Sequence, residues 1–463
     1  MAAPSPLCKA NTSFSLALFR KLSDNDTTAN IFYSPFSISS ALAMVLLGAR
    51  GNTAAQMSES LKTKGLEDDV HVSFSQLLNE LHKENAPYAL SIANRLYGEQ
   101  SYQFVEDFLG STKKHYRAEL ESVDFRAAAE TSRSNINSWV EKQTEGKIKD
   151  LLAKGIVTGD TRLVLVNAIY FKGNWDKQFK ENATRDATFH ISKNSSKPVK
   201  MMNQTSKFPF IFISEANCQV LELPYVGKEL SMLIFLPEQI EDSTTGLEKL
   251  EKLLTYDNFM EWTRPDMMDV VEVQVGLPRF KMEEKCNMKN ILVSMGMVDA
   301  FDVAASDFSG MSPANDLVLS EVIHKAFVEV NEEGTEAAAA TGVVMNLRSA
   351  RPSERFYADH PFLFFIRHNP SRNILFAGNM AAPSPLCKAN TSFSLALFRK
   401  LSDNDTTANI FYSPFSISSA LAMVLLGARG NTAAQMSEDI CVLQMKALQR
   451  QSRSLWWVRC GFW

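Results

Sequence analysis

The spacing of apolar residues near the start of the chain is helical. Phe14, Ala17, Leu18 and Leu22 recur at intervals of three and four residues, so they form one stripe, and basic side chains lie off it. This pattern predicts a surface helix that starts the fold.

A second helix is expected to begin at Pro35. Ser34 can accept hydrogen bonds from free backbone amides, and proline suits the first helical position. Residues 36–47 are apolar on almost all sides, and Gly48 follows them as a stop signal. We therefore predict that this helix is buried.

The pattern changes from helices to strands towards the middle of the chain. Up to Leu120 it predicts mixed helical segments, including residues 73–84 and 104–115. Residues 163–171 are then apolar almost without a break, which predicts a strand at the centre of a sheet. Further strands are predicted at residues 220–223, 230–236, 270–277, 326–330, 361–367 and 374–377. This order is typical of an α+β protein with large sheets.

Composition narrows the possible functions. The 463 residues are 45% hydrophobic and include thirty phenylalanines, so they can fill a large core and do not form a disordered or fibrous chain. Basic residues number 48 against 52 acidic ones and are not concentrated in either half, so no nucleic-acid partner is expected. No apolar run approaches the ~18 residues of a membrane span, so no membrane association is expected.

The amino terminus and the cysteines indicate the compartment. Residues 1–10 hold one lysine and no apolar run, and no cleavage site follows, so no signal peptide is predicted. No cysteine pair has the spacing of a zinc site or a disulfide framework, which suggests reduced thiols. The six are Cys8, Cys218, Cys286, Cys387, Cys441 and Cys460. We expect a cytoplasmic protein, and release from cells without a cleaved signal peptide remains open.

Sequence motifs of catalysis are missing. The chain has no G-x-S-x-G turn, phosphate-binding loop, H-E-x-x-H helix or G-x-G-x-x-G turn, and no two histidines stand at helical spacing. We therefore predict no catalytic residues, no metal site and no cofactor, and we do not expect an enzyme.

One long segment of the chain is repeated. Residues 1–59 return without a change as residues 380–438, whereas solenoid repeats are short, numerous and diverged. We therefore predict a functional body over residues 1–383, a fused partial copy over 380–438 and an unrelated tail over 439–463. The body is expected to be monomeric. The copied apolar helix has no sheet to cover it, so it is expected to promote aggregation or oligomers.

A long connection lies between the predicted strands 326–330 and 361–367. Residues 331–360 are too many for an ordinary connection, which suggests a functional loop. By helix propensity alone, residues 336–340 would form a helical turn, so an exposed alanine-rich helix or a flexible linker is the alternative. The residue pattern alone leaves both open.

Five stretches of sequence decide between these alternatives. Residues 30–41, 51–56, 167–175, 328–341 and 358–367 resemble, in this order, the intracellular, ovalbumin-like (clade B) branch of the serpins. The resemblance extends over residues 1–383. It implies the α+β serpin fold, with three β-sheets, eight or nine helices and an exposed reactive-centre loop. It also implies a metastable inhibitor whose loop serves as bait for a protease.

The resemblance also assigns a mechanism to the loop. The cleaved loop enters a sheet as an added strand, which buries every second side chain. The residues of this inward-facing parity must therefore be small or apolar, whereas those of the outward parity face solvent. Glu336 falls on the outward parity, and the inward residues carry neither charge nor proline. The predicted hinge and insertion face are Glu333, Gly334, Thr335, Ala337, Ala339, Thr341, Val343 and Met345.

The flanks of the loop place the scissile bond, by the same resemblance, at Arg348–Ser349. An arginine there suits a protease whose specificity pocket carries a carboxylate, so a covalent complex with a trypsin-like serine protease is predicted. Elastase-like or papain-like proteases that cut at Met345 or Leu347 are an alternative. A non-inhibitory serpin that acts as a chaperone, carrier or storage protein is another.

The resemblance assigns further residues to the opening of the main sheet. A polar cluster is predicted beneath the opening, and an aromatic residue is predicted where insertion begins. These residues are Ser34, Ser37, Asn167 and His324 for the cluster and Trp175 for the aromatic position. Residues 378–383 depart from the usual serpin ending at Asn379 and Met380, but the last strand is still expected to form.

Overall fold

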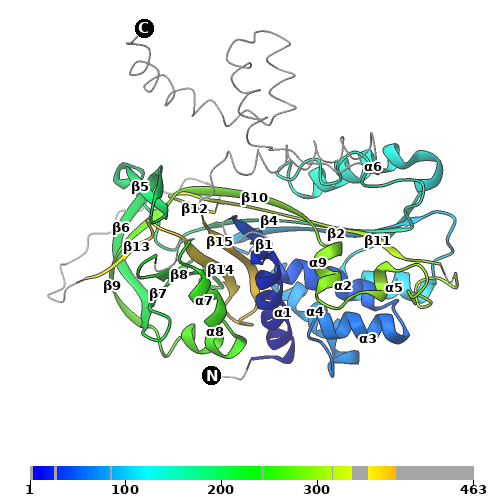
Figure 1. The fold of residues 1–463 in the computed structure, drawn as a ribbon, viewed down its shortest axis with the longest axis horizontal. Helices are drawn as coiled ribbons and strands as arrows, with labels where there is room; N and C mark the ends of the chain where they lie inside the picture. Colours follow the sequence, from blue (N-terminus) through cyan, green and yellow to red (C-terminus); the bar gives the residue numbers. More distant parts are fainter. Residues whose placement is uncertain are drawn as a thin grey trace, which may run out of the picture. The chain divides into compact units, whose positions relative to one another are not determined.

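The computed structural model describes residues 4–24, 29–83, 86–240, 245–314, 316–335 and 353–381 (Figure 1). Residues 382–438 of the predicted copy and the predicted tail 439–463 lie outside this part of the chain.

A six-stranded sheet forms one part of the described fold. Its order is β10–β11–β12–β4–β2–β3, and β4 and β11 also pair directly as parallel neighbours. The short β12 is antiparallel to both. Its strands are β2 (Tyr88–Glu99), β3 (Leu120–Val123), β4 (Leu163–Asn174), β10 (Phe280–Asn287), β11 (Leu319–Val330) and β12 (Gly334–Thr335). The apolar segment that predicted a central strand is β4, which confirms that prediction.

The second hydrogen-bonded network has nine strands, in the order β1–β15–β14–β8–β7–β6–β9–β13, with β5 paired to β6. The long β6 pairs with β5 and β9 along its first part and with β7 at its end, so it joins two of the three predicted sheets into one network. The strands are β1 (Ile31–Tyr33), β5 (Arg185–Ser192), β6 (Ser195–Ile213), β7 (Cys218–Pro224), β8 (Leu230–Pro237), β9 (Asp269–Pro278), β13 (Glu354–Tyr357), β14 (Phe362–His368) and β15 (Ile374–Met380).

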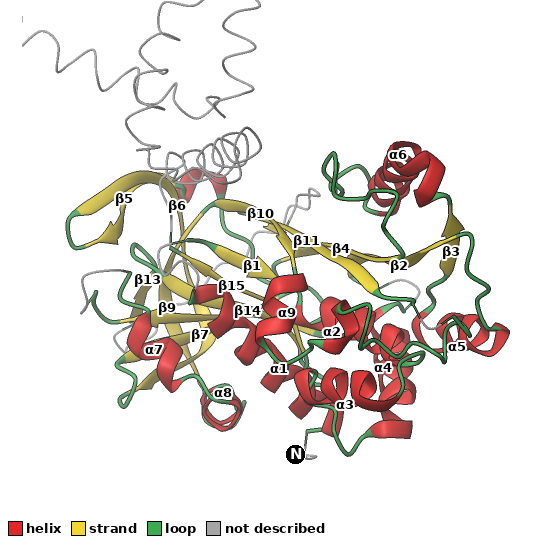
Figure 2. Ribbon diagram, turned by 45° about the vertical axis from the view of Figure 1, so that its right-hand side comes forward, coloured by secondary structure: helices red, strands yellow, loops and turns green. Residues whose placement is uncertain are grey.

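Nine α-helices occur in the described residues, and two short 3-10 turns, Glu181–Ala183 and Asp299–Phe301, accompany them. In Figures 1 and 2, α6 lies on one side of the six-stranded sheet, and α1 to α5 and α9 lie on the other. The helices are α1 (Pro6–Ser23), α2 (Pro35–Leu46), α3 (Gly51–Ser60), α4 (Glu67–Leu81), α5 (Glu106–Tyr116), α6 (Phe125–Gln143), α7 (Glu248–Leu253), α8 (Tyr256–Trp262) and α9 (Lys289–Ser294).

The buried helix α2 confirms the capping prediction. Ser34 is its N-cap and accepts a hydrogen bond from the amide of Ser37, Pro35 opens the helix, and every helical residue is buried. The departure at the end of the body also leaves the last strand intact. Asn379 lies within β15, and its side-chain oxygen accepts a hydrogen bond from the amide of Ile31 at 2.6 Å.

The prediction of helical segments up to Leu120 is wrong for β2. Residues 88–99 combine helix formers with an irregular alternation of apolar side chains, yet β2 pairs with β4 from Tyr88 to Gly98. Tertiary pairing overrides the local propensity there. In addition, β11 begins seven residues before its predicted start, and β3, β5, β6, β10 and β13 were not predicted. The last of these lies within the segment 331–360 that was expected to be a loop.

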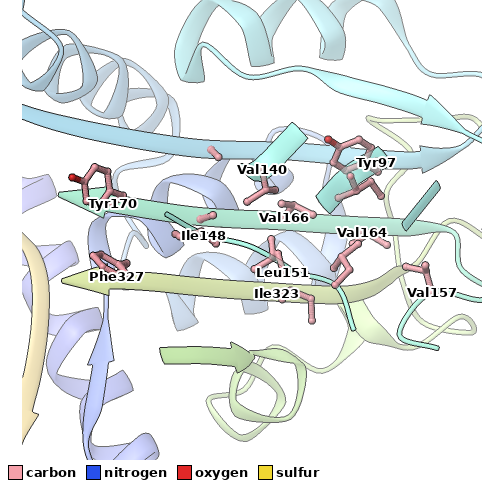
Figure 3. Close-up of a cluster of buried hydrophobic side chains, with 14 of the residues drawn as sticks. Tyr97, Val140, Ile148, Leu151, Val157, Val164, Val166, Tyr170, Ile323 and Phe327 are labelled. Atoms are coloured by element: carbon pink, nitrogen blue, oxygen red, sulfur yellow. The ribbon is translucent and has the colours of Figure 1, made fainter. Parts of the chain in front are cut away.

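A buried apolar cluster covers one face of β2, β4 and β11 (Figure 3). Alternate strand residues share this face, and the cluster continues into α6 and the segment after it. Glu99 at the end of β2 accepts hydrogen bonds from the amides of Phe125 and Arg126 at 2.7 and 3.2 Å, which holds the start of α6 against the sheet. The labelled members in Figure 3 are Tyr97, Val140, Ile148, Leu151, Val157, Val164, Val166, Tyr170, Ile323 and Phe327.

Candidate functional site

The seam between β4 and β11 is closed along most of its length and open at one end. The two strands pair in parallel register until Tyr170 faces Phe327. Beyond that point β12 lies between them, with Gly334 opposite Asn174 and Thr335 opposite both Gly173 and Val330. The predicted hinge therefore occupies the first positions of a strand inside the sheet.

The backbone of Gly334 passes too close to β4 for any larger residue. Its φ of +153° is one that side-chain-bearing residues rarely adopt. A Cβ atom at this position would lie 2.1 Å from the carbonyl oxygen of Gly173 and 2.6 Å from Cα of Asn174. Glycine is therefore needed here for close backbone approach.

Trp175 anchors the turn that leads into β12. Its side chain is buried, with 2% of the residue exposed. The indole N–H donates to the carbonyl oxygen of Asn331 at 3.0 Å, and the backbone N–H donates to the carbonyl oxygen of Glu333 at 2.8 Å. Its ring stacks on Tyr225, with 4.6 Å between the ring centres. The predicted aromatic position thus lies directly beside the hinge.

A buried hydrogen-bond cluster lies further along the seam. His324 of β11 faces Asn167 of β4, and His324 Nδ1 is hydrogen-bonded to the side-chain oxygen of Asn167. Because that oxygen can only accept, Nδ1 carries the proton, and Nε2 accepts from the amide of Ser34 at 3.2 Å. Burial lowers the pKa of His324 to about 3, so the ring is neutral at pH 7.

The same cluster ties the seam to α2. Asn167 donates through Nδ2 to Ser37 Oγ at 2.6 Å and to the Ser37 carbonyl at 3.1 Å, and Ser34 Oγ donates to the carbonyl of Leu375 at 2.6 Å. The structure therefore brings Ser34, Ser37, Asn167 and His324 together. Their role in the opening of the sheet remains a prediction.

Comparison with known proteins identifies the fold that carries this seam. A family model described as "Serpin (serine protease inhibitor)" matches residues 9–383 and 388–457. The chain belongs to the serpin family. That description names inhibition of serine proteases as the activity of the family.

Named relatives of this serpin include leukocyte elastase inhibitors. The protein from Equus caballus is 56% identical over 377 residues, which cover 81% of this chain and 99% of the relative, and that from Homo sapiens is 54% identical over the same lengths. Among solved structures, uncleaved ovalbumin is 38% identical, with a TM-score of 0.75, and the match covers 82% of this chain and 100% of the ovalbumin chain. Maspin is 36% identical, with a TM-score of 0.76, and the match covers 81% of this chain and 98% of the maspin chain.

An aromatic pair holds the other face of this serpin's seam. Tyr170 and Phe327 form an edge-to-face contact, with ring centres 5.8 Å apart, on the side of the sheet that α6 covers (Figure 3). They are the last residues of β4 and β11 to pair directly, so they lie immediately ahead of β12. Sequence reasoning did not single them out, because their spacing is that of ordinary core residues.

Four polar or aromatic partners of the site were also missed. Asn94 of β2 accepts a hydrogen bond from Asn167 and donates to Ser40 Oγ at 3.3 Å. Asn331 accepts from the amides of Glu333 and Gly334 at 3.1 Å. An asparagine three residues before a glycine is a turn signal that could have found Asn331. Glu332 accepts a hydrogen bond from Thr184 Oγ1 at 2.7 Å. No comparable sequence signal marks Glu332 or Tyr225.

The remaining predicted residues of this serpin's loop lie outside the described part of the chain. They are Ala337, Ala339, Thr341, Val343, Met345, Arg348 and Ser349. Within the described ranges, no group of His, Cys, Asp or Glu side chains could hold a metal ion, and Cys8, Cys218 and Cys286 are free thiols. None of the helices described is long and apolar enough to span a bilayer.

Proposed function

We propose that this serpin inhibits serine proteases as a suicide substrate. A protease cuts the bond Arg348–Ser349, the released strand enters the seam between β4 and β11, and the protease stays covalently attached to Arg348. The observation that carries this proposal is the position of β12. Gly334 pairs with β4, and Thr335 already pairs with both strands of the seam.

The register of β12 fixes where the rest of the loop would lie after insertion. An antiparallel strand moves one position back along its partner for each residue added. Because Thr335 lies opposite Gly173 and Val330, Thr341 would lie opposite both Asn167 and His324. Insertion would therefore separate the Asn167–His324 hydrogen bond and place a threonine hydroxyl between the two side chains.

The same register accounts for the composition of the insertion face. The inward residues would lie on the side of β4 that includes Asn167 and Phe171, which faces the buried core. Met345 would reach Leu163, the first residue of β4. The chain from residue 335 to 348 spans roughly 45 Å when extended, so an attached protease would be carried to the opposite end of the sheet.

The residue at the bait position supports a trypsin-like target. A guanidinium group pairs with a carboxylate through two parallel hydrogen bonds, which favours a protease with an acidic specificity pocket. The names of the relatives favour a second candidate, an elastase-like protease that cuts after Met345 or Leu347.

Incubation of the full chain with trypsin, and separately with leukocyte elastase, tests the two candidate target proteases. We expect trypsin to give a complex that survives denaturing electrophoresis, and the released peptide to begin at Ser349 by mass spectrometry. A complex with elastase alone, with a peptide that begins at Asn346 or Arg348, would replace the first target by the second. A cleaved loop with fully active protease in both reactions would instead support a chaperone, carrier or storage role.

A further inference from the structure

A cavity of about 440 Å³ lies outside the seam. Its walls come from β6, β7, β8, β9 and β14 and from Asp176 and Lys177, which directly follow Trp175. Neither the proposed loop insertion nor the predicted bait uses this cavity. Its volume falls within the range that is common for small-molecule sites.

Positive charge dominates the lining. The described residues around the cavity include five basic side chains, namely Lys177, Lys207, Lys228, Arg367 and Arg372, and two acidic ones, Asp176 and Glu222. Both carboxylates already lie near a cation. Glu222 is 3.3 Å from the buried Arg367, and Asp176 is 3.8 Å from Lys228. The two acids do not balance the five bases, so the cavity favours an anion.

The environment of Lys177 agrees with this charge balance. Burial lowers its pKa, Lys228 and Lys207 lower it further, and Asp176 acts in the opposite direction. Its ammonium group donates to the carbonyl oxygen of Lys207 at 2.7 Å and lies 5.2 Å from the centre of the Phe208 ring. An anion beside this group would stabilise its charged form.

Apolar side chains supply the rest of the wall. Phe208 and Met268 are buried, whereas Val270 is 65% exposed although it also lines the cavity. Met267, next to Met268 in the chain, is 42% exposed. A cationic interior beside exposed apolar side chains matches a ligand that has both an acidic group and an apolar body.

We propose that this cavity binds an amphipathic organic anion, such as a carboxylate or sulfonate with a hydrocarbon or aromatic body. The acidic group lies near Lys177 and Lys207, and the apolar body packs on Phe208 and Val270.

Calorimetric titration of the full chain with decanoate at low ionic strength tests the proposal. Val270 gives a matched pair of variants, because it is exposed and both substitutions place a charge at the same point. We expect Val270→Asp to weaken decanoate binding about tenfold more than Val270→Lys does, because both variants lose the apolar contact and they differ in the sign of the charge. Lys177→Gln should weaken it about fivefold. Lys64→Gln, on an exposed turn away from the cavity, should have no effect.

Decanamide is the matched neutral probe, and it should bind at least about tenfold more weakly than decanoate. Equal affinities for the two probes, equal affinities of the two Val270 variants, or no decanoate binding to the unmodified chain at millimolar concentration would each overturn the proposal. Melting temperatures within a few degrees of the unmodified chain establish that the variants are folded.

Discussion

The two ends of the β4–β11 seam are held in different ways. At the hinge, the backbone of β12 pairs with both strands, and a glycine allows the close approach. In the closed part, β4 and β11 pair with each other, the Asn167–His324 contact joins them on one face and the Tyr170–Phe327 pair joins them on the other. Among the described residues, the backbone of β12 therefore enters the open end of the seam, whereas side-chain contacts join β4 and β11 along the closed part.

The largest expected effect is at Thr335. Thr335 is the residue from which the proposed insertion continues, since it already pairs with both strands of the seam, and a buried arginine without a partner is strongly unfavourable. We expect Thr335→Arg to reduce the fraction of protease trapped more than about tenfold, while cleavage of the loop continues. Denaturing electrophoresis measures both products. Glu336→Gln, on the outward parity, is the matched control and should trap normally. Equal trapping by both variants would contradict the insertion of this parity.

A smaller effect is expected at Gly334. A methyl group there would meet the carbonyl of Gly173 at 2.1 Å, so Gly334→Ala should expel β12 from the seam and lower the free energy of unfolding by about 2 kcal/mol. Gly110 is the matched control, because it lies within α5 and a Cβ there has no neighbour within 4 Å. Gly110→Ala should stabilise by up to about 1 kcal/mol. Urea unfolding of the two variants measures the difference, and a Gly334→Ala variant as stable as the unmodified chain would show that β12 is not tightly held.

The third prediction concerns the polar face of the closed part. The fold keeps His324 neutral because burial lowers its pKa from 6.5 to about 3, whereas the unfolded chain takes up a proton below pH 6.5. The stability that follows from this shift is fully present above pH 6.5 and is lost as the pH falls towards 3. Between pH 7.5 and pH 5 the loss is about 2 kcal/mol.

Urea unfolding of the unmodified chain and of His324→Gln at both pH values checks this prediction. The unmodified chain should be the more stable at pH 7.5, and its advantage should shrink by about 2 kcal/mol at pH 5. His190→Gln, at an exposed position on β5, is measured alongside as the control for the loss of a histidine outside the seam. An advantage that is the same at both pH values would show that His324 does not link this seam to pH.

The sequence predicted some residues of the site and missed others. The helix cap at Ser34 and the apolar run of β4 are local signals, and the family resemblance added Asn167, His324 and Trp175. Asn94 was missed because β2 is a strand only through its pairing with β4. Tyr225 lies 50 positions from Trp175, so only the folded chain shows that the two rings stack. Local patterns predicted single elements, while contacts between distant segments needed the structure.

The smallest expected effect concerns the aromatic face of the closed part. Phe327→Leu removes the edge-to-face contact with Tyr170 and should lower the free energy of unfolding by about 1 kcal/mol. Since this contact lies directly ahead of β12, its loss should also speed the formation of the protease complex severalfold. Phe259 of α8 is the matched control, because it makes a similar contact with Phe365, with ring centres 5.0 Å apart, away from the seam. Phe259→Leu should give a comparable loss of stability without a change in rate. If both variants change the trapping rate equally, general destabilisation controls insertion and the aromatic pair has no separate role at the seam.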